Sequence, residues 1–150
     1  MLAITLHEPW ATLIARGDKA IETRGWTTRY RGPLAIHASK SDKYVDMWPD
    51  LWFDADRNAP VPPPPSYWPH GEVIAIVDLV GVQPTESLKP SAKEKAFGDF
   101  SPGRFGWLLQ NVRPVVPGVM CRGMRMLWMV PSETKQELKA RLCEVAGGGR

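Results

Sequence analysis

The chain has 150 residues, of which 43% are hydrophobic and 23% charged, and its formal net charge at pH 7 is +3. This length and hydrophobic content suit one domain with a single core. No apolar run approaches the roughly 20 residues that cross a bilayer, and no secretory signal pattern opens the chain. We therefore expect one cytoplasmic domain over residues 1–150, without a membrane partner.

The first predicted elements are a strand over Leu2–Leu6 and a short helix. Pro9 suits a first helical position, and Gly17 suits the position just after a helix end. The apolar residues between them recur at helical spacing: Trp10, Leu13 and Ile14. His7 lies beside the predicted helix start, where a neutral imidazole can accept a backbone hydrogen bond. We expect it to act as a cap.

The segment after this helix combines an amine, a carboxylate, a hydroxyl and a guanidinium, on Lys19, Glu22, Thr23 and Arg24. Its alternation predicts a strand over Ala20–Arg24, with Glu22 and Arg24 on the face opposite Ile21 and Thr23. A bend near Ala20 would bring Lys19 toward Glu22. The alternative is a surface ladder of ion pairs, each worth well under about 1 kcal/mol.

Four further strands are predicted, at Leu34–Ala38, Glu72–Val82, Phe105–Val112 and Arg125–Val130. The strongest run of β-branched residues lies between residues 72 and 80. The run at 72–80 is expected to be central and buried on both faces for part of its length. Residues 131–146 show helical spacing of apolar residues and predict a C-terminal surface helix. Short strands with few long helices favour an α+β fold built on a small barrel.

Residues 44–70 contain tryptophans around a proline-rich stretch, Pro62-Pro63-Pro64-Pro65. Prolines lack a backbone donor, so we expect an inserted surface loop. Three interpretations are open: an aromatic lid that closes over a base, a proline-rich partner site, or a loop fixed to the barrel by its own tryptophans. The last is favoured.

Basic residues gather in the first third of the chain, among aromatic ones: Arg24, Arg29, Arg31, Lys40 and Lys43, with Trp26 and Tyr30. Cations that pair with phosphates and rings that stack on bases are typical of nucleotide sites. A solvated basic face over packed aromatic residues is the alternative. The two cysteines, Cys121 and Cys143, have no partner at metal-ligand spacing, so we expect neither a metal site nor a disulfide framework, and no cofactor.

Two further places hold candidate binding residues. A predicted tight turn contains Asp99, Ser101 and Arg104. An Asx turn, in which the side chains bond their own backbone, explains the first two residues. The arginine can pair with a phosphate or with Asp99. His37 ends a predicted strand near Ser39 and Lys40, although a lone histidine more often bonds a backbone carbonyl.

The pattern Gly17-x-Lys19-x-x-Glu22-x-Arg24 resembles the signature of the ASCH (activating signal cointegrator homology) domain family. The residues before it, Leu6-His7-x-Pro9-Trp10, and after it, from Trp26 to Ala38, add to the likeness, as does the block from Phe97 to Trp107. This resemblance implies a PUA-like β-barrel with flanking helices, in which a cleft between barrel and helices holds the motif. It also favours RNA or a modified nucleoside as the partner.

Some ASCH-like proteins hydrolyse N4-acetylcytidine with a lysine, a threonine and a glutamate. Lys19 matches the lysine, whereas Glu22 occupies the threonine position, and Glu94 or Asp99 is the candidate for the distal carboxylate. The resemblance thus implies Lys19 as base or oxyanion donor, with its pKa lowered by burial and by Arg24, and Glu22 as the activator of water.

In this mechanism Trp10 or Trp26 stacks the cytosine, while Arg31 or Arg104 holds the ribose or phosphate. Two other functions are open. Lys19, Glu22 and Arg24 could support metal-independent cleavage of single-stranded RNA, or the domain could be a non-catalytic reader of RNA or a modified base. The expected binding residues are Trp10, Thr23, Trp26, Arg31, His37, Asp99, Ser101 and Arg104.

Overall fold

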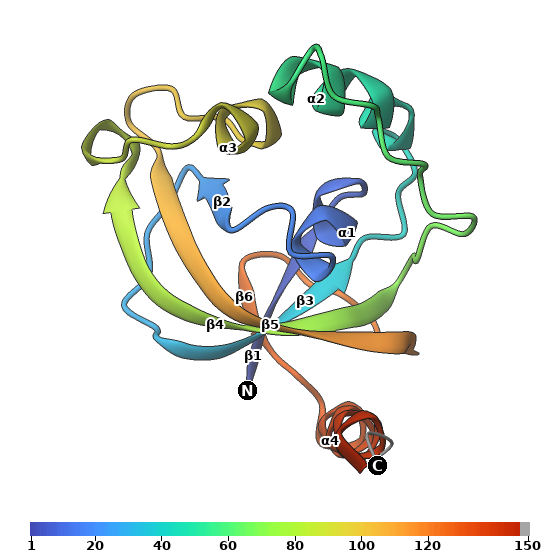
Figure 1. The fold of residues 1–150 in the computed structure, drawn as a ribbon. Coiled ribbons are helices and arrows are strands. Elements are labelled where there is room, and N and C mark those ends of the chain that lie inside the picture. The colour runs from blue at the N-terminus through green and yellow to red at the C-terminus, as the bar shows by residue number, and fades with distance from the viewer. Residues whose placement is uncertain (148–150) are drawn as a thin grey trace.

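The computed structural model describes residues 1–147 and is built around one six-stranded sheet. The strands are β1 (Leu2–Leu6), β2 (Ile21–Arg24), β3 (Gly32–Ala38), β4 (Glu72–Pro84), β5 (Phe105–Met120) and β6 (Leu127–Met129). They lie in the order β2-β5-β4-β3-β1-β6, with β1 and β3 parallel and every other neighbouring pair antiparallel. The sheet curls into a half-barrel (Figure 1).

Four α-helices flank the sheet on two sides. Three short ones, α1 (Trp10–Ala15), α2 (Trp48–Ala55) and α3 (Ala92–Phe97), lie on its concave side, whereas α4 (Ser132–Gly147) lies beneath its convex side (Figure 1). Two 3-10 turns, η1 (Val45–Met47) and η2 (Thr85–Ser87), precede α2 and α3. This arrangement confirms the expected α+β class and PUA-like barrel. Within residues 1–147, every helix is too short or too polar to cross a bilayer.

The strand β4 forms the centre of the core, as its sequence predicted. It pairs with β3 on one side and β5 on the other, and its residues are buried from Glu72 through Val77. Its side chains enter two apolar clusters, one with Ile14 on the concave side and one with Leu138 of α4 on the convex side. The sheet is therefore sandwiched between helices on both faces.

The segment 44–70 differs from the expected loop because it contains η1 and α2. Trp48 is only 1% exposed, and its indole Nε1 donates to the carbonyl of Pro62 at 2.8 Å. Its ring meets Trp68 edge to face at 5.6 Å, which fixes the proline-rich stretch against the helix. Trp52 packs in the same way on Phe97 of α3. The tryptophans thus hold this segment in place. Trp48 and Trp52 also belong to α2, a helix that the neighbouring prolines did not suggest.

The strand β5 extends past the predicted end at Val112, despite prolines at 114 and 117. The ladder pairs Ala75 with Pro114 and Val73 with Val119, so residues 115–118 form an irregularity between the two pairings. Pro117 lies within this irregularity, where a proline is tolerated because the displaced backbone makes no ladder bond. Val116, at the tip, is 80% exposed.

Candidate functional site

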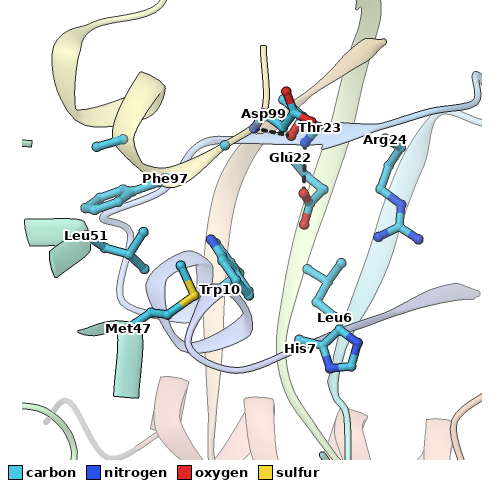
Figure 2. Close-up of a pocket in the computed structure, with 12 residues that line it drawn as sticks. Leu6, His7, Trp10, Glu22, Thr23, Arg24, Met47, Leu51, Phe97 and Asp99 are labelled. Atoms are coloured by element: carbon cyan, nitrogen blue, oxygen red, sulfur yellow. Dashed lines mark hydrogen bonds between the residues drawn. The ribbon is translucent and has the colours of Figure 1, made fainter. Parts of the chain in front are cut away.

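A cleft of about 350 Å³ lies on the concave side of the sheet, between β2 and the helices α1, α2 and α3 (Figure 2). Its walls are mainly apolar and come from Leu6, Trp10, Met47, Leu51 and Phe97. The polar groups that enter it are His7, Glu22, Thr23, Arg24 and Asp99. An apolar cavity with a few convergent polar groups is the usual form of a small-ligand site.

Glu22 is the most deeply placed acidic group of the cleft. It lies on β2 opposite Trp107 of β5, its residue is 8% exposed, and its Oε1 accepts the amide of Thr23 at 2.8 Å. Figure 2 shows its carboxyl group directed into the cleft above Trp10. One carboxylate oxygen is thus held by the backbone, which fixes the direction of the group.

Thr23 and Asp99 join β2 to the loop after α3. The hydroxyl of Thr23 accepts the amide of Asp99 at 3.0 Å, the contact drawn in Figure 2. Gly98 permits this approach, because a Cβ there would lie 3.3 Å from the Thr23 side chain. Hydrogen bonds from the hydroxyl and amide of Ser101 lower the pKa of Asp99, and the Arg104 charge adds to the shift. Asp99 is therefore an anion at the rim of the cleft.

Lys19 is buried and is not among the residues that line the cleft. It is 1% exposed, and its ammonium donates to the carbonyls of Ile21 at 2.6 Å and Phe97 at 2.9 Å. Glu94 completes the junction, since its carboxylate accepts the amides of Ala20 at 2.6 Å and Ile21 at 3.3 Å. The two side chains tie the start of β2 to α3, and the Lys19 ammonium contacts backbone carbonyls where the sequence suggested an approach to Glu22.

Arg24 and the aromatic residues occupy distinct places. The guanidinium of Arg24 lies over the ring of Trp26 at 5.7 Å, and Trp26 packs edge to face on Trp107 at 4.8 Å. Trp26 lies outside the lining of the cleft and packs against the guanidinium of Arg24. The indole that enters the cleft is that of Trp10, which contacts Tyr44 edge to face at 5.4 Å.

The other predicted binding residues lie away from the cleft lining. Arg31 donates to the carbonyls of Thr28 and Tyr30. Arg104 pairs with Asp99 at 3.5 Å and donates to the carbonyl of Thr23 at 3.3 Å, which positions those two residues. Ser101 completes the Asx turn of Asp99. His37 of β3 is buried and lines a second pocket.

Sequence patterns did not single out several lining residues. Met47 and Leu51 come from the segment that was expected to be a loop. His7, expected as a helix cap, instead presents an exposed ring to the cleft, while the amide of Thr12 in α1 donates to Glu8 Oε2 at 3.3 Å. The signal for His7 was its position, because a side chain just after a strand end lies where the sheet opens toward the helices.

The sequence model of the ASCH domain matches residues 4–140. The chain belongs to the ASCH domain family. It is 28% identical over 141 residues to human activating signal cointegrator 1, and 28% identical over 144 residues to the mouse protein of that name. Each alignment covers 93% of this chain but 24% of the relative, so the chain spans about a quarter of those proteins.

Solved structures of the family share the fold of this ASCH domain. The crystal structure of ASCH from Zymomonas mobilis matches with a TM-score of 0.54 and 13% sequence identity, covering 93% of each chain. A mutant of that protein with one tyrosine replaced by phenylalanine gives the same TM-score and identity, over 93% of this chain and 96% of the other. At this identity the likeness concerns the fold, and the chemistry of the cleft is argued from its own residues.

Proposed function

We propose that this ASCH domain binds RNA or a modified nucleoside by holding one unstacked base in the cleft. The observation that carries the proposal is the pairing of Trp10 and Glu22 within one cavity of about 350 Å³. Stacking of a base on an aromatic side chain is worth roughly 1–3 kcal/mol and tolerates any base. A carboxylate accepts a hydrogen bond from the exocyclic amine of cytosine, which gives Glu22 a role in base choice.

The guanidinium of Arg24 supports a ligand that carries phosphate. Arg24 lies at the edge of the cleft and is stacked on Trp26, which limits the conformations of its guanidinium. A preorganised guanidinium pairs well with phosphate oxygens. The ligand that fits this combination is a nucleotide with its base inward and its phosphate at the rim.

Hydrolysis of an N4-acylated cytidine to cytidine is the finer candidate, and the position of Glu22 favours it. Glu22 would remove a proton from water as the oxygen attacks the acyl carbonyl, and the amine of cytidine would leave with a proton as the acid is released. Lys19 can serve as an oxyanion donor only if ligand binding shifts Phe97, because Lys19 is outside the cleft lining and its ammonium is bonded to the Phe97 carbonyl. The test therefore includes Lys19 as well as Glu22.

The experiment measures binding and turnover separately. Cytidine, N4-acetylcytidine and a short single-stranded RNA are titrated against the protein by calorimetry, and products are analysed by chromatography with and without chelator. Trp10→Ala is expected to weaken binding by about 5- to 150-fold, in line with the removal of one stacking interaction worth roughly 1–3 kcal/mol. Phe53→Ala, an exposed aromatic residue of α2 outside the cleft lining, is the matched control.

The products decide among the activities. Cytidine released from N4-acetylcytidine and abolished by Glu22→Gln would support the hydrolase. If release also fails in Lys19→Ala with the fold intact, the oxyanion role gains support. Shortened RNA that persists with chelator would favour a ribonuclease, and binding without products would indicate a reader. Failure of all three ligands to bind would overturn the proposed function.

A further inference from the structure

A second pocket, of about 510 Å³, lies beside the cleft and carries a concentration of positive charge. Its basic lining residues are Lys40, after β3, and Arg122 and Arg125, in the connection between β5 and β6. All three are exposed, and the pocket lining contains no Asp or Glu. None of the ion pairs within residues 1–147 involves these three side chains. Their charge is therefore available to an anionic ligand.

The floor of this pocket is a buried hydrogen-bonded chain that fixes the basic connection. The indole of Trp128 donates to the hydroxyl of Thr5 at 3.1 Å, which leaves that hydroxyl to donate to His37 Nδ1 at 3.2 Å. His37 Nε2 then donates to the carbonyl of Cys121 at 2.7 Å. Both ring nitrogens of His37 are thus occupied within the protein. His37 positions the residue next to Arg122 and does not itself contact a ligand in this arrangement.

Gly123 lets the basic connection lie directly on that floor. A Cβ at this position would lie 2.5 Å from His37 Cε1 and 2.8 Å from Thr5 Oγ1, closer than real contacts allow. The backbone between Arg122 and Arg125 therefore sits against His37, and the two guanidiniums extend from a fixed base. Burial lowers the pKa of His37, which keeps the floor neutral and leaves the positive charge at the rim.

His7 connects the two pockets, because it lines both of them. In the view of Figure 2 its ring lies across the cleft from Phe97, at the end nearest β1. A ligand that extends from the cleft past His7 enters the basic pocket. Since the cleft fits a base, the part of the same ligand that reaches the basic pocket is the chain that links one nucleotide to the next.

We propose that the pocket formed by Lys40, Arg122 and Arg125 binds the phosphodiester backbone of a single-stranded RNA whose base occupies the cleft. This inference rests on the proposed function and extends it from one nucleotide to a strand. Phosphate contacts of this kind position a strand without reading its sequence. The base then supplies selectivity, and the basic pocket supplies affinity that depends on salt.

The test compares a ligand without phosphate to a strand. Affinities of cytidine and of a short cytidine-containing single-stranded RNA are measured across a salt series for the protein and for Arg122→Ala with Arg125→Ala. We expect the affinity for cytidine to be unchanged. For the strand, the slope of log K against log salt should become shallower by about 0.7 for each phosphate interaction that the substitutions remove. Inorganic phosphate is titrated as well, to distinguish a strand site from a site for the free anion.

Two controls keep the result interpretable. Lys139→Ala with Arg57→Ala removes two exposed cations that line neither pocket, and it should leave the slope unchanged. Arg122→Lys with Arg125→Lys should restore the slope, and thermal unfolding checks that all variants fold alike.

Three outcomes would overturn the inference. An unchanged slope in the double alanine variant, with strand binding still lost in Trp10→Ala, would reject the basic pocket and keep the base cleft. Equal binding of inorganic phosphate and strand would indicate an anion site unrelated to RNA. If wild-type protein binds neither cytidine nor strand, the proposed function itself is wrong, and this inference falls with it.

Discussion

Glu8 is a fully buried carboxyl group at the start of α1, and burial raises its pKa from 4.5 to about 7. Its Oε2 accepts the amide of Thr12, whereas its Oε1 has no hydrogen-bond partner within the described residues. An ionised carboxylate is costly in such a position. The neutral form is therefore the one that suits the folded chain.

This burial predicts a fold that loses stability as the pH rises. Below pH 4.5 both folded and unfolded chains hold the Glu8 proton, and between that value and about 7 only the folded chain retains it. The shift corresponds to about 3 kcal/mol of unfolding free energy, lost as the pH rises through the folded pKa. Glu8→Gln should remove this dependence. Between low and high pH, the unfolding free energy measured with urea should fall by about 3 kcal/mol more in the wild type than in the variant. A parallel pH dependence in the two proteins would show that Glu8 is not the responsible group.

At the scale of elements, the junction between β2 and α3 depends on two charged side chains that lie outside the cleft lining. Lys19 donates to the carbonyls of Ile21 and Phe97, and Glu94 accepts the amides of Ala20 and Ile21. Ser91 caps α3 by accepting the amide of Glu94, which leaves the Glu94 carboxylate directed at the neighbouring strand. We infer that the family motif has a structural half, Lys19, and a cleft-facing half, Glu22 and Arg24.

Lys19→Met should therefore destabilise the fold. The substitution keeps an unbranched side chain of similar length but leaves two buried carbonyl groups without their charged donor, a loss of about 2–4 kcal/mol. Thermal unfolding measures it, and Lys95→Met, an exposed lysine of α3, should have almost no effect. If Lys19→Met unfolds like the wild type yet abolishes turnover, the ammonium acts in catalysis and not in the junction.

The sequence predicted elements well where one periodicity prevailed and less well where tertiary contacts decided. Alternating or continuous apolar residues located β1, β3 and β4. The helix α2 was missed because its neighbouring prolines suggest a loop, although Trp48 packs in the core and bonds Pro62. The sequence could not show whether Lys19 lines the cleft, because its position depends on a hydrogen bond to the carbonyl of Phe97, a residue distant in the chain.

At the scale of the whole molecule, the sheet separates a layer that holds the cleft from a layer that holds α4. The concave side holds the cleft and the three short helices, whereas α4 covers the convex side (Figure 1). Leu138 of α4 is 0% exposed and packs in the cluster that contains Val73 and Val119. Because β4 and β5 lie between that cluster and the cleft, stability and ligand binding should respond to different sets of residues.

Leu138→Ala tests this separation. Removal of a fully buried leucine is expected to lower the unfolding free energy by about 2–5 kcal/mol. The affinity of the folded protein for cytidine should stay unchanged, because none of the cleft residues belongs to α4. Val145→Ala, on the same helix but 69% exposed, should leave both quantities unaltered. Denaturant unfolding and calorimetry measure the two quantities; if cytidine binding weakens in step with the loss of stability, the two faces of the sheet are mechanically coupled and α4 contributes to the shape of the cleft.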